Sequence, residues 1–360
     1  MTELPEDDLS IIVENSSQDL RSLDGANIVV TGGTGFIGSW IVESILQARR
    51  DLGVEIRLTV PSRSPDAYVA QRPHLRHITN LSFVRTDIRT PFDHLEPADA
   101  IIHAATEASA ALNDSNPAEM LDVIVAGMSN VLAYASRCGS IPFLFTSSGA
   151  VYGEQPLDMS HVPESFTGAP DALDHSSAYH EGKRVAELLG AIASHQSDIR
   201  FVSARLFAFL GPLLPLDTHF AAGNFLADAL AGRTITVNGD GTPLRSYMHP
   251  IDMCTWLFAL LARGQDRRAY NVGSEESVSI RLLAEMIDAA GASAGVDIGK
   301  PAIEGVAPKR YVPSTERARA ELDLRQHIGL SDAIERTMRW HEARVIRPER
   351  TPLRPTSPLR

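Results

Sequence analysis

Short apolar runs recur along the first 210 residues, and segments with apolar residues at every third or fourth position separate them. The runs cover residues 27–30, 54–60, 81–87, 98–105, 141–148 and 200–207. The runs at 27–30 and 141–148 are typical of buried strands, whereas residues 54–60 alternate between apolar and polar positions. The segments between them predict helices, of which the longest covers residues 120–139 and ends at a glycine. Strands that alternate with crossover helices predict an α/β fold with a Rossmann-type, doubly wound parallel sheet.

The pattern changes after about residue 210. A proline-rich loop leads to a predicted helix over 223–231, then a short strand and hairpin within 232–250, then amphipathic helices over 281–291 and 330–345. We therefore expect a Rossmann domain over residues 25–210. A smaller α+β lobe, interleaved with the sheet, is expected over residues 211–345.

The two ends of the chain differ from this core. Residues 1–24 are polar apart from one apolar patch, and are expected to form an N-terminal arm or a short added strand. Residues 346–360 are rich in Pro and Arg and lack apolar anchors, so we expect a disordered tail.

Composition narrows the class of protein. The chain is 44% hydrophobic and 22% charged, as in ordinary soluble proteins, and its net charge of -12 argues against a nucleic-acid or anionic-membrane partner. Its two cysteines favour a reducing cytoplasm. The acidic N-terminus lacks the apolar core of a signal peptide, and no membrane span is expected. His74 and His77 have no further ligand at metal spacing, so no metal site is expected either.

A glycine-rich stretch, residues 31–38, lies between the first predicted strand and a predicted helix. Gly32, Gly35 and Gly38 have G-x-x-G-x-x-G spacing. Glycine permits the tight turn and lets the backbone approach a pyrophosphate, and the helix N-terminus offers free N–H groups to the anion. The stretch predicts a dinucleotide-binding loop, with Phe36 and Ile37 among the contacts. A glycine-rich turn without a ligand is the alternative.

The ends of the next two strands bear on the choice of cofactor. A NAD site usually has an acid after the second strand, which accepts from the ribose 2′-hydroxyl. Residues 60–62 contain no acid, and Arg63 follows, where it could hold a 2′-phosphate. The sequence thus leans slightly to NADP and leaves NAD open, since Arg63 could also be a surface residue. Asp87, followed by Ile88, is placed for the adenine edge, or alternatively caps a turn.

Three polar residues form the candidate catalytic set. Ser148 ends a buried strand, and ligands sit at that edge of parallel sheets. Tyr179 and Lys183 are one helical turn apart, which alone would describe any exposed pair. A phenol with a pKa of about 10 is a poor base at neutral pH, but a lysine cation nearby stabilises the phenolate. Tyr179 could then remove an alcohol proton while hydride leaves the carbon for a nicotinamide, with Ser148 holding the substrate oxygen. Gly182, inside the same helix, would permit close approach of the cofactor.

Several of these segments resemble the extended short-chain dehydrogenase/reductases, in the branch of NAD-dependent nucleotide-sugar epimerases and dehydratases. The likeness runs from about residue 26 to 340 and includes the glycine loop, "SSGAVYG" (147–153), "YHEGK" (179–183), "LFAFLGP" (206–212) and "YNVGS" (270–274). The resemblance implies that "HAAT", with His103, Ala104 and Ala105, lies beside the cofactor. It also implies a homodimer and a lobe that binds a nucleoside-diphosphate sugar.

The resemblance also suggests substrate contacts. Arg245 matches the arginine that contacts the nucleotide diphosphate in this family, and Asn224 and Arg310 are further candidates. For the two arginines the alternative is a surface salt bridge, and for Asn224 it is a helix cap.

Departures from the family pattern narrow the chemistry. Sugar 4,6-dehydratases of this family have an Asp-Glu pair after the active-site hydroxyl, and nucleotide-sugar decarboxylases usually keep a Glu there. This chain has Gly149 and Ala150 at those positions, together with Ile124 and Ala208 where the family usually has Asn. The sequence therefore predicts a nucleotide-sugar 4-epimerase, with dehydration and decarboxylation disfavoured. An NADPH-dependent 4-ketosugar reductase is the rival enzyme, and an NAD(P)-binding sensor without turnover is the rival outside catalysis.

Overall fold

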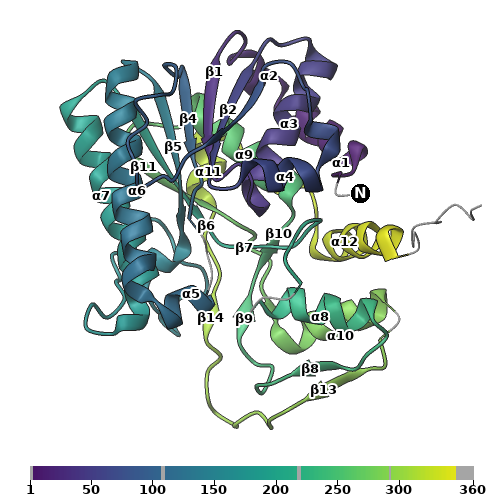
Figure 1. The fold of residues 1–360 in the computed structure, drawn as a ribbon. Coiled ribbons are helices and arrows are strands. Elements are labelled where there is room, and N and C mark those ends of the chain that lie inside the picture. The colour runs from purple at the N-terminus through teal and green to yellow at the C-terminus, as the bar shows by residue number, and fades with distance from the viewer. Residues whose placement is uncertain (1–2, 107–109, 217–219, 292, 346–360) are drawn as a thin grey trace, which may run out of the picture.

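A seven-stranded sheet forms the centre of the computed structural model, which describes residues 3–106, 110–216, 220–291 and 293–345 (Figure 1). The strand order is β11-β6-β5-β4-β1-β2-β3, and every pairing is parallel. The strands are β1 (Asn27–Thr31), β2 (Arg57–Ser62), β3 (Leu81–Arg85), β4 (Ala100–His103), β5 (Pro142–Ser148), β6 (Arg200–Leu206) and β11 (Arg268–Val272). The order reverses beside β1, so the predicted doubly wound α/β fold is confirmed.

Helices cover both faces of this sheet. On one face lie α6 (Pro117–Cys138) and α7 (Ala178–Gln196), and on the other α3 (Phe36–Leu52) and α9 (Pro250–Arg263). Shorter helices on the same domain are α4 (Pro65–Gln71), α5 (Ala110–Ser115) and α11 (Glu316–Leu322). Val29 belongs to the core on the α6–α7 side, whereas Ile28 and Val30 belong to the core on the α3–α9 side. Burial on both faces explains why β1 is uninterrupted apolar sequence.

A smaller lobe extends from the sheet and is built from remote parts of the second half (Figure 1). Its helices are α8 (Ala221–Leu230), α10 (Ile280–Ala290) and α12 (Leu330–Val345). Its strands are β7 (Ala208–Phe209), β8 (Ile235–Val237), β9 (Leu244–Arg245), β10 (Tyr247–Met248), β12 (Val278–Ser279), β13 (Val296–Ile298) and β14 (Arg310–Tyr311). Between residues 220 and 345 the chain returns to the main domain for α9, β11 and α11, so the lobe is interleaved with it.

The N-terminal segment is helical, so the short added strand that the sequence suggested does not form, and the assignment of residues 1–24 as a separate arm stays a prediction. Residues Glu6–Asn15 form α1 and Ser17–Arg21 form α2. Leu9, Ile12 and Val13 are buried, and α1 packs against α3 and α9. Their spacing of three and four residues is helical, and it outweighs the short β-branched run that suggested a strand. The domain boundaries stay a prediction.

The hairpin expected within residues 232–250 does not form. β8 pairs in parallel with β13, β9 pairs with β12 and β14, and β10 pairs in parallel with β7. These strands have two or three residues each, too few to stabilise a hairpin alone, so partners from distant segments decide the pairing.

Helix α6 is long and apolar. By length and composition alone, α6 could cross a membrane, contrary to the expectation that no segment approaches that size. In the structure it packs against α7 and β4, and Met120, Ile124 and Met128 are buried. A buried core helix passes the same length test, so α6 is accounted for by the fold. The predicted disordered tail, 346–360, lies outside the described residues.

Candidate active site

The glycine loop joins β1 to α3 and leaves open space in front of the helix. Gly32 has φ +69°, and a Cβ on it would lie 2.3 Å from the Ala104 carbonyl oxygen, so only glycine fits. A Cβ on Gly38 would lie 2.1 Å from the Gly32 oxygen. Gly35 is the N-cap of α3, and no side chain caps the helix there. A Cβ on Gly35 would meet only the Gly32 oxygen, at 3.4 Å, so the backbone is uncrowded at this helix N-terminus, and a pyrophosphate bound there stays a prediction.

Other predicted cofactor contacts surround this loop in different ways. Phe36 and Ile37 begin α3 and are partly buried against the core. Ala104 is hydrogen-bonded through its backbone N–H to the Thr31 carbonyl, beside the loop. The Ile88 side chain packs against Gly127 of α6. These positions border the predicted cofactor site, and their contact with a cofactor stays a prediction.

His103 is a buried structural residue. Its Nδ1 lies 2.7 Å from Thr31 Oγ1, and its ring stacks on Phe145. Burial, with the nearby Lys183 charge, lowers the pKa of His103 to about 3, so the ring is neutral at physiological pH. The side chain ties the ends of β1 and β4 together.

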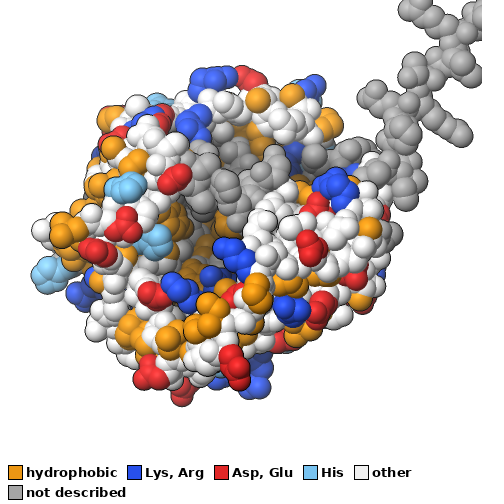
Figure 2. Space-filling model, turned by 90° about the horizontal axis from the view of Figure 1, so that it is seen from below, with side chains coloured by type: hydrophobic (Ala, Val, Ile, Leu, Met, Phe, Trp, Pro, Cys, Tyr) orange, Lys and Arg blue, Asp and Glu red, His pale blue; other side chains and the backbone are white. Residues whose placement is uncertain are grey.

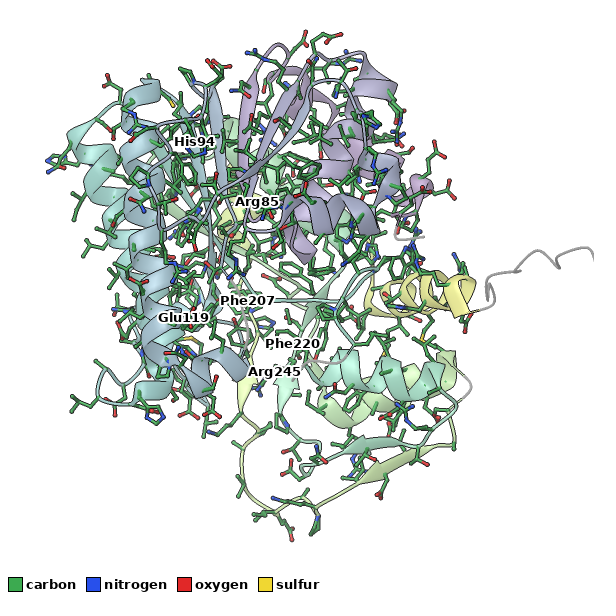
Figure 3. All side chains as sticks on the ribbon, viewed as in Figure 1. Arg85, His94, Glu119, Phe207, Phe220 and Arg245 are labelled. Atoms are coloured by element: carbon green, nitrogen blue, oxygen red, sulfur yellow. The ribbon has the colours of Figure 1, made fainter. Side chains whose placement is uncertain are left out.

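A cavity of about 400 Å³ lies at the carboxyl ends of β2 and β3. Arg63, Arg85, Thr86, Asp87, Thr90 and His94 line it. The Arg85 guanidinium donates to the Arg63 carbonyl at 3.1 Å and pairs with Asp66 at 2.6 Å. Arg85 and His94 lie on the upper part of the molecule in Figure 3. Two guanidinium groups therefore border the position where the ribose of a dinucleotide is expected.

Asp87 is held by its own turn. Its carboxylate accepts from the Arg89 backbone at 2.9 Å and from the Arg89 guanidinium at 2.8 and 3.1 Å. These hydrogen bonds lower the pKa of Asp87 to about 2. The turn-capping alternative describes these contacts, and Asp87 still borders the cavity through the same loop.

Ser148, Tyr179 and Lys183 come together at the carboxyl end of β5. The Lys183 ammonium donates to the Thr146 carbonyl at 2.7 Å and to Thr106 Oγ1 at 3.0 Å. It lies 5.8 Å from the centre of the Tyr179 ring. Ser148 is the last residue of β5, and its Oγ accepts from the Ala150 N–H at 3.1 Å. The three residues that sequence reasoning grouped are thus neighbours in space, and their catalytic roles stay a prediction.

Burial changes the ionisation of this cluster. It lowers the pKa of Lys183 to about 7, although the Glu187 charge one turn along α7 opposes the change. Burial raises the pKa of Tyr179, and interaction with the Ser148 hydroxyl opposes that rise. Glu187 itself is fixed by Arg205, with a 2.7 Å ion pair. The phenol and the ammonium therefore lie in a site with little water, which disfavours the charged form of each. Ser148 stabilises the charged form of Tyr179, and Glu187 stabilises that of Lys183.

Helix packing explains Gly182, and close approach of a cofactor there stays a prediction. A Cβ on Gly182 would lie 2.9 Å from the Ile124 side chain and 3.4 Å from Leu121, both on α6. The glycine allows α6 and α7 to approach closely.

The candidate substrate residues lie in the lobe. β9 and β14 pair so that Arg245 is opposite Tyr311, and the Arg245 guanidinium is 6.0 Å from the Tyr311 ring centre. Side chains alternate along a strand, so Arg310 leaves this pair on the other face. Its Nε is buried without a hydrogen-bond partner among the described residues. Within the described part of the chain, neither arginine forms an ion pair, so the surface salt-bridge alternative finds no support.

Asn224 is exposed on the first turn of α8, and it does not cap the helix. Phe220 occupies the N-cap position. The lower face of the molecule is hollowed beside the lobe, and Lys and Arg side chains gather there (Figure 2). Phe207 and Arg245 lie near each other in this region (Figure 3). A substrate with a diphosphate would find cationic side chains at this face.

Comparison with known proteins agrees with this geometry. A family model described as "NAD dependent epimerase/dehydratase family" matches residues 28–273. The chain belongs to this family. UDP-glucuronic acid decarboxylase 5 of Arabidopsis thaliana is 33% identical over 260 residues, which cover 72% of this chain and 73% of that protein. The expected resemblance to extended short-chain dehydrogenase/reductases is thereby confirmed, and the protein is an NAD-dependent nucleotide-sugar-modifying enzyme.

Solved structures of the family have the same fold. A UDP-glucose 4-epimerase of Thermotoga maritima with UDP-glucose has a TM-score of 0.76 and 20% identity, covering 89% of this chain and 99% of that one. A dTDP-glucose 4,6-dehydratase of Streptomyces venezuelae with NAD has a TM-score of 0.74 and 25% identity, covering 88% and 97%.

Position 149, directly after Ser148, is crowded by two aromatic residues. A Cβ on Gly149 would lie 2.7 Å from both the Phe207 ring and the Tyr311 hydroxyl. Gly149 therefore has no room for an acidic side chain. Sequence reasoning missed Tyr311 and Arg85. Arg85 could have been found as the last residue of a strand at the ligand edge, but no local signal marks Tyr311.

Proposed function

We propose that this enzyme epimerises a nucleoside-diphosphate sugar at C4 through a transient 4-keto sugar. The observation that carries the proposal is the Ser148–Tyr179–Lys183 cluster, followed by Gly149 and Ala150 where related enzymes have acids. This set provides for removal and return of a hydroxyl proton, and offers no carboxylate there for chemistry at C5.

The residues divide the work as follows. Ser148 donates a hydrogen bond to the C4 oxygen of the sugar. Tyr179, in its phenolate form, removes the proton of the C4 hydroxyl. Lys183, held by Thr146 and Thr106, stabilises that phenolate. The redox chemistry is what a bound nicotinamide dinucleotide supplies, by taking a hydride from C4 and giving it back. Between these events the ketose turns its other face to the cofactor, and Tyr179 returns the proton to the oxygen.

A nucleoside-diphosphate sugar is the proposed substrate because of the lobe. The Nε of Arg310 is buried and has no partner in the described chain, and Arg245 lies at the Tyr311 ring. Guanidinium groups match the geometry of a diphosphate. The substrate seen with the Thermotoga maritima epimerase, UDP-glucose, belongs to this class.

Decarboxylation of a nucleoside-diphosphate uronic acid is a second candidate. The Arabidopsis thaliana relative at 33% identity, a UDP-glucuronic acid decarboxylase, favours it. Oxidation of a uronic acid at C4 gives a β-keto acid, which can lose carbon dioxide without a further catalytic acid. The first step, oxidation at C4, is therefore shared with epimerisation. After loss of carbon dioxide C5 needs a proton, and Gly149 and Ala150 have no acidic side chain that could supply it, which disfavours decarboxylation.

A 4-ketosugar reductase is supported by a different observation. The cavity with Arg63 and Arg85 suits a 2′-phosphate, and so favours NADP(H) over NAD(H). A reductase consumes one NADPH for each turnover, whereas an epimerase returns its cofactor to the starting state.

One experiment separates these outcomes. One portion of the purified protein is denatured to identify any released nucleotide. Native protein is incubated with UDP-glucose, UDP-N-acetylglucosamine, dTDP-glucose and UDP-glucuronic acid, and separately with a nucleoside-diphosphate 4-keto sugar and NADPH. Nuclear magnetic resonance identifies the products. We expect C4-inverted sugar without net consumption of cofactor. Loss of carbon dioxide from UDP-glucuronic acid would establish the decarboxylase. Turnover of a 4-keto sugar only with stoichiometric loss of NADPH absorbance would establish the reductase. Cofactor binding without conversion of any substrate would favour a sensor.

A further inference from the structure

Tyr311 reaches the catalytic cluster from a distant part of the chain. It lies on β14, and its hydroxyl is 2.7 Å from the position of a Cβ on Gly149. The ring packs on Phe207, with 4.7 Å between ring centres. The Ser148 hydroxyl lies beside both Tyr311 and Tyr179, and its interaction with each phenol opposes the rise in their pKa values. Ser148 therefore interacts with two phenols.

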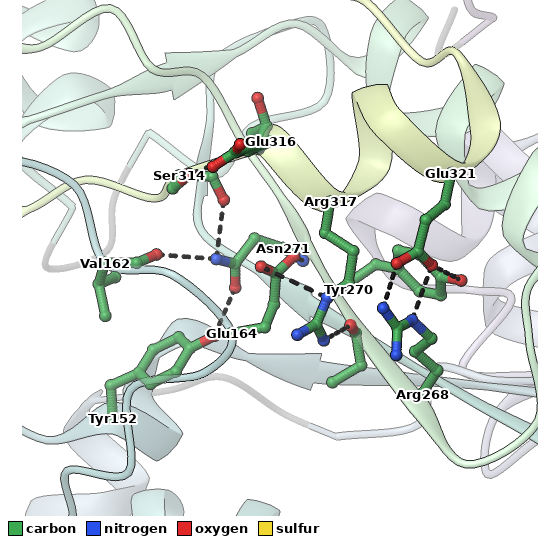
Figure 4. Close-up of polar contacts among 12 residues, drawn as sticks. Tyr152, Val162, Glu164, Arg268, Tyr270, Asn271, Ser314, Glu316, Arg317 and Glu321 are labelled. Carbon is green, nitrogen blue, oxygen red and sulfur yellow. Dashed lines mark hydrogen bonds and ion pairs between the residues drawn. The ribbon is translucent and has the colours of Figure 1, made fainter.

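The segment that presents Tyr311 is fixed to the segment that follows Ser148. The Val312 N–H donates to Gln155 Oε1 at 2.9 Å, and the Val162 N–H donates to the Val312 carbonyl at 2.9 Å. Asn271 binds both segments of this junction, because its Nδ2 donates to the Val162 and Ser314 carbonyls at 2.9 Å (Figure 4). These hydrogen bonds hold the segment after β14 against the active-site edge.

The same asparagine has a further partner inside the main domain. Its Oδ1 accepts from the Tyr152 hydroxyl at 2.7 Å. Tyr152 follows Ser148 by four residues, in the short helix Gly149–Tyr152. The position of the Tyr311 hydroxyl is thus set by contacts on both sides.

The hydrogen-bonding capacity of Ser148 gives this placement a consequence. A hydroxyl donates one hydrogen bond and accepts two. Ser148 Oγ already accepts from the Ala150 N–H. Burial raises the pKa of Tyr311, so the phenol keeps its proton and can serve as a donor. If Tyr311 fills the second acceptor site, the Ser148 proton must point to Tyr179 or to a substrate oxygen.

We propose that Tyr311 is a positioning residue that keeps the Ser148 proton directed at Tyr179 in the free enzyme, or at the substrate oxygen when substrate is bound. The proposal rests on the proposed C4 chemistry and adds to it a second phenol, which stands in the space that an acid at position 149 would need. Tyr311 thereby favours the phenolate of Tyr179, because a correctly oriented Ser148 donates to it. The residue also keeps position 149 free of a carboxylate.

The first test needs no substrate. Tyrosinate absorbance is titrated against pH for the native protein and for Tyr311→Phe, each with and without Tyr179→Phe, and the difference reports Tyr179. The Phe variant keeps the ring against Phe207 and removes only the hydroxyl. We expect the Tyr179 titration to move up by about half to one pH unit. An unchanged Tyr179 midpoint would overturn the proposal, whatever the substrate proves to be.

The second test uses turnover. We expect Tyr311→Phe to lower kcat by about three- to tenfold, with KM for the sugar nearly unchanged. In a Ser148→Ala background the same change should have almost no effect, because Tyr311 acts through Ser148. Additive effects of the two substitutions would overturn the proposal.

Tyr134→Phe is the matched control, because Tyr134 is a buried tyrosine on α6 whose hydroxyl donates to the Glu96 carbonyl. This substitution should leave kcat and its dependence on pH unchanged. Failure of the native protein to convert any nucleotide sugar would count against the proposed function, and the titration would still decide the role of Tyr311.

Discussion

At the scale of single residues, burial makes Lys183 easier to deprotonate and Tyr179 harder. The pKa of Lys183 is lowered to about 7, and that of Tyr179 is raised. Near neutral pH the pair therefore has less charge than the same groups in water. Deprotonation of Tyr179 depends on Ser148 and on a protonated Lys183 at the moment of reaction. Small changes around these groups should have large effects on turnover.

The sharpest single-residue prediction concerns Tyr179→Phe. The substitution keeps the ring and its packing and removes the proton acceptor. Turnover should fall by about 10² or more, in line with general-base contributions, while the fold is retained. Steady-state kinetics measure the fall, and circular dichroism checks the fold. Near-normal turnover in this variant would end the catalytic assignment of Tyr179.

Cofactor choice is a second prediction at this scale. Arg63→Ala and Arg85→Ala each remove a guanidinium from the cavity at the ends of β2 and β3. Each should weaken NADP(H) binding by roughly tenfold, since a charge-assisted phosphate contact is lost, and leave NAD(H) binding unchanged. Fluorescence titration of both cofactors measures this. Arg57→Ala, at the opposite end of β2, is the control. Equal binding of both cofactors, unaffected by either substitution, would make Arg63 and Arg85 surface residues and NAD the cofactor.

The sequence predicted that Ser148, Tyr179 and Lys183 lie close together, but it did not predict that Tyr311 lies beside them. Ser148, Tyr179 and Lys183 are close because a strand end and the first turn of a helix meet at one sheet edge, which the βα pattern predicts. Tyr311 was missed because its contact with Ser148 spans more than 160 residues and depends on the pairing of two-residue strands. Local propensity contains no information about such pairing.

At the scale of elements, glycines decide how closely helices and strands approach. Gly182 lets α7 approach α6 closely, and Gly190 on the same helix faces β6. A Cβ on Gly190 would lie 2.2 Å from two ring atoms of Phe201, which is buried. A ring held in a packed core cannot move aside easily.

Gly190→Ala should therefore destabilise the protein. Helix propensity alone favours alanine by about 1 kcal/mol, but overpacking against the Phe201 ring costs more, so we expect a net loss of about 1–2 kcal/mol in the free energy of unfolding. Chemical denaturation measures the change. His195→Ala, exposed on the same helix, should stay within about 0.5 kcal/mol of the native protein. A more stable Gly190→Ala variant would show that helix propensity outweighs the contact.

Element prediction succeeded where burial imposed a regular pattern. The central strands are buried on both faces, and their continuous apolar runs were recognised. The N-terminal helices were missed because the β-branched residues of α1 suggested a short strand, although its buried positions have helical spacing. The strands of the lobe were paired wrongly because each is too short to determine its own partner.

At the scale of the whole molecule, helices α6 and α7 expose an apolar surface to solvent when the chain is a monomer. Val185, Leu188 and Ile192 are 37%, 60% and 43% exposed, and their spacing places them along one side of α7. Leu121 of α6, 39% exposed, adds to this surface, and the two helices pack against each other. Figure 1 shows both at the outer edge of the main domain. Scattered apolar residues are ordinary on a surface, but a continuous patch marks an interaction site.

We propose that a second copy of this chain covers that patch and forms a homodimer. In a twofold dimer the same surface faces itself, so a residue near the axis meets its own copy. Leu188→Glu would then bring two carboxylates together in an apolar interface, and the dimer should dissociate to monomers at micromolar concentration. Sedimentation velocity measures the mass. Leu173→Glu is the matched control, because Leu173 is 96% exposed and precedes α7, and it should leave the dimer intact. A native protein that sediments as a monomer would show that no such dimer forms. A Leu188→Glu variant that stays dimeric would show that the dimer contact lies elsewhere. The dimer contact would also support α6 and α7, and α7 holds Tyr179 and Lys183 against the sheet. The glycine loop, which is expected to bind the cofactor, lies outside this contact. Loss of the dimer should therefore lower the melting temperature of the protein more than it lowers cofactor affinity.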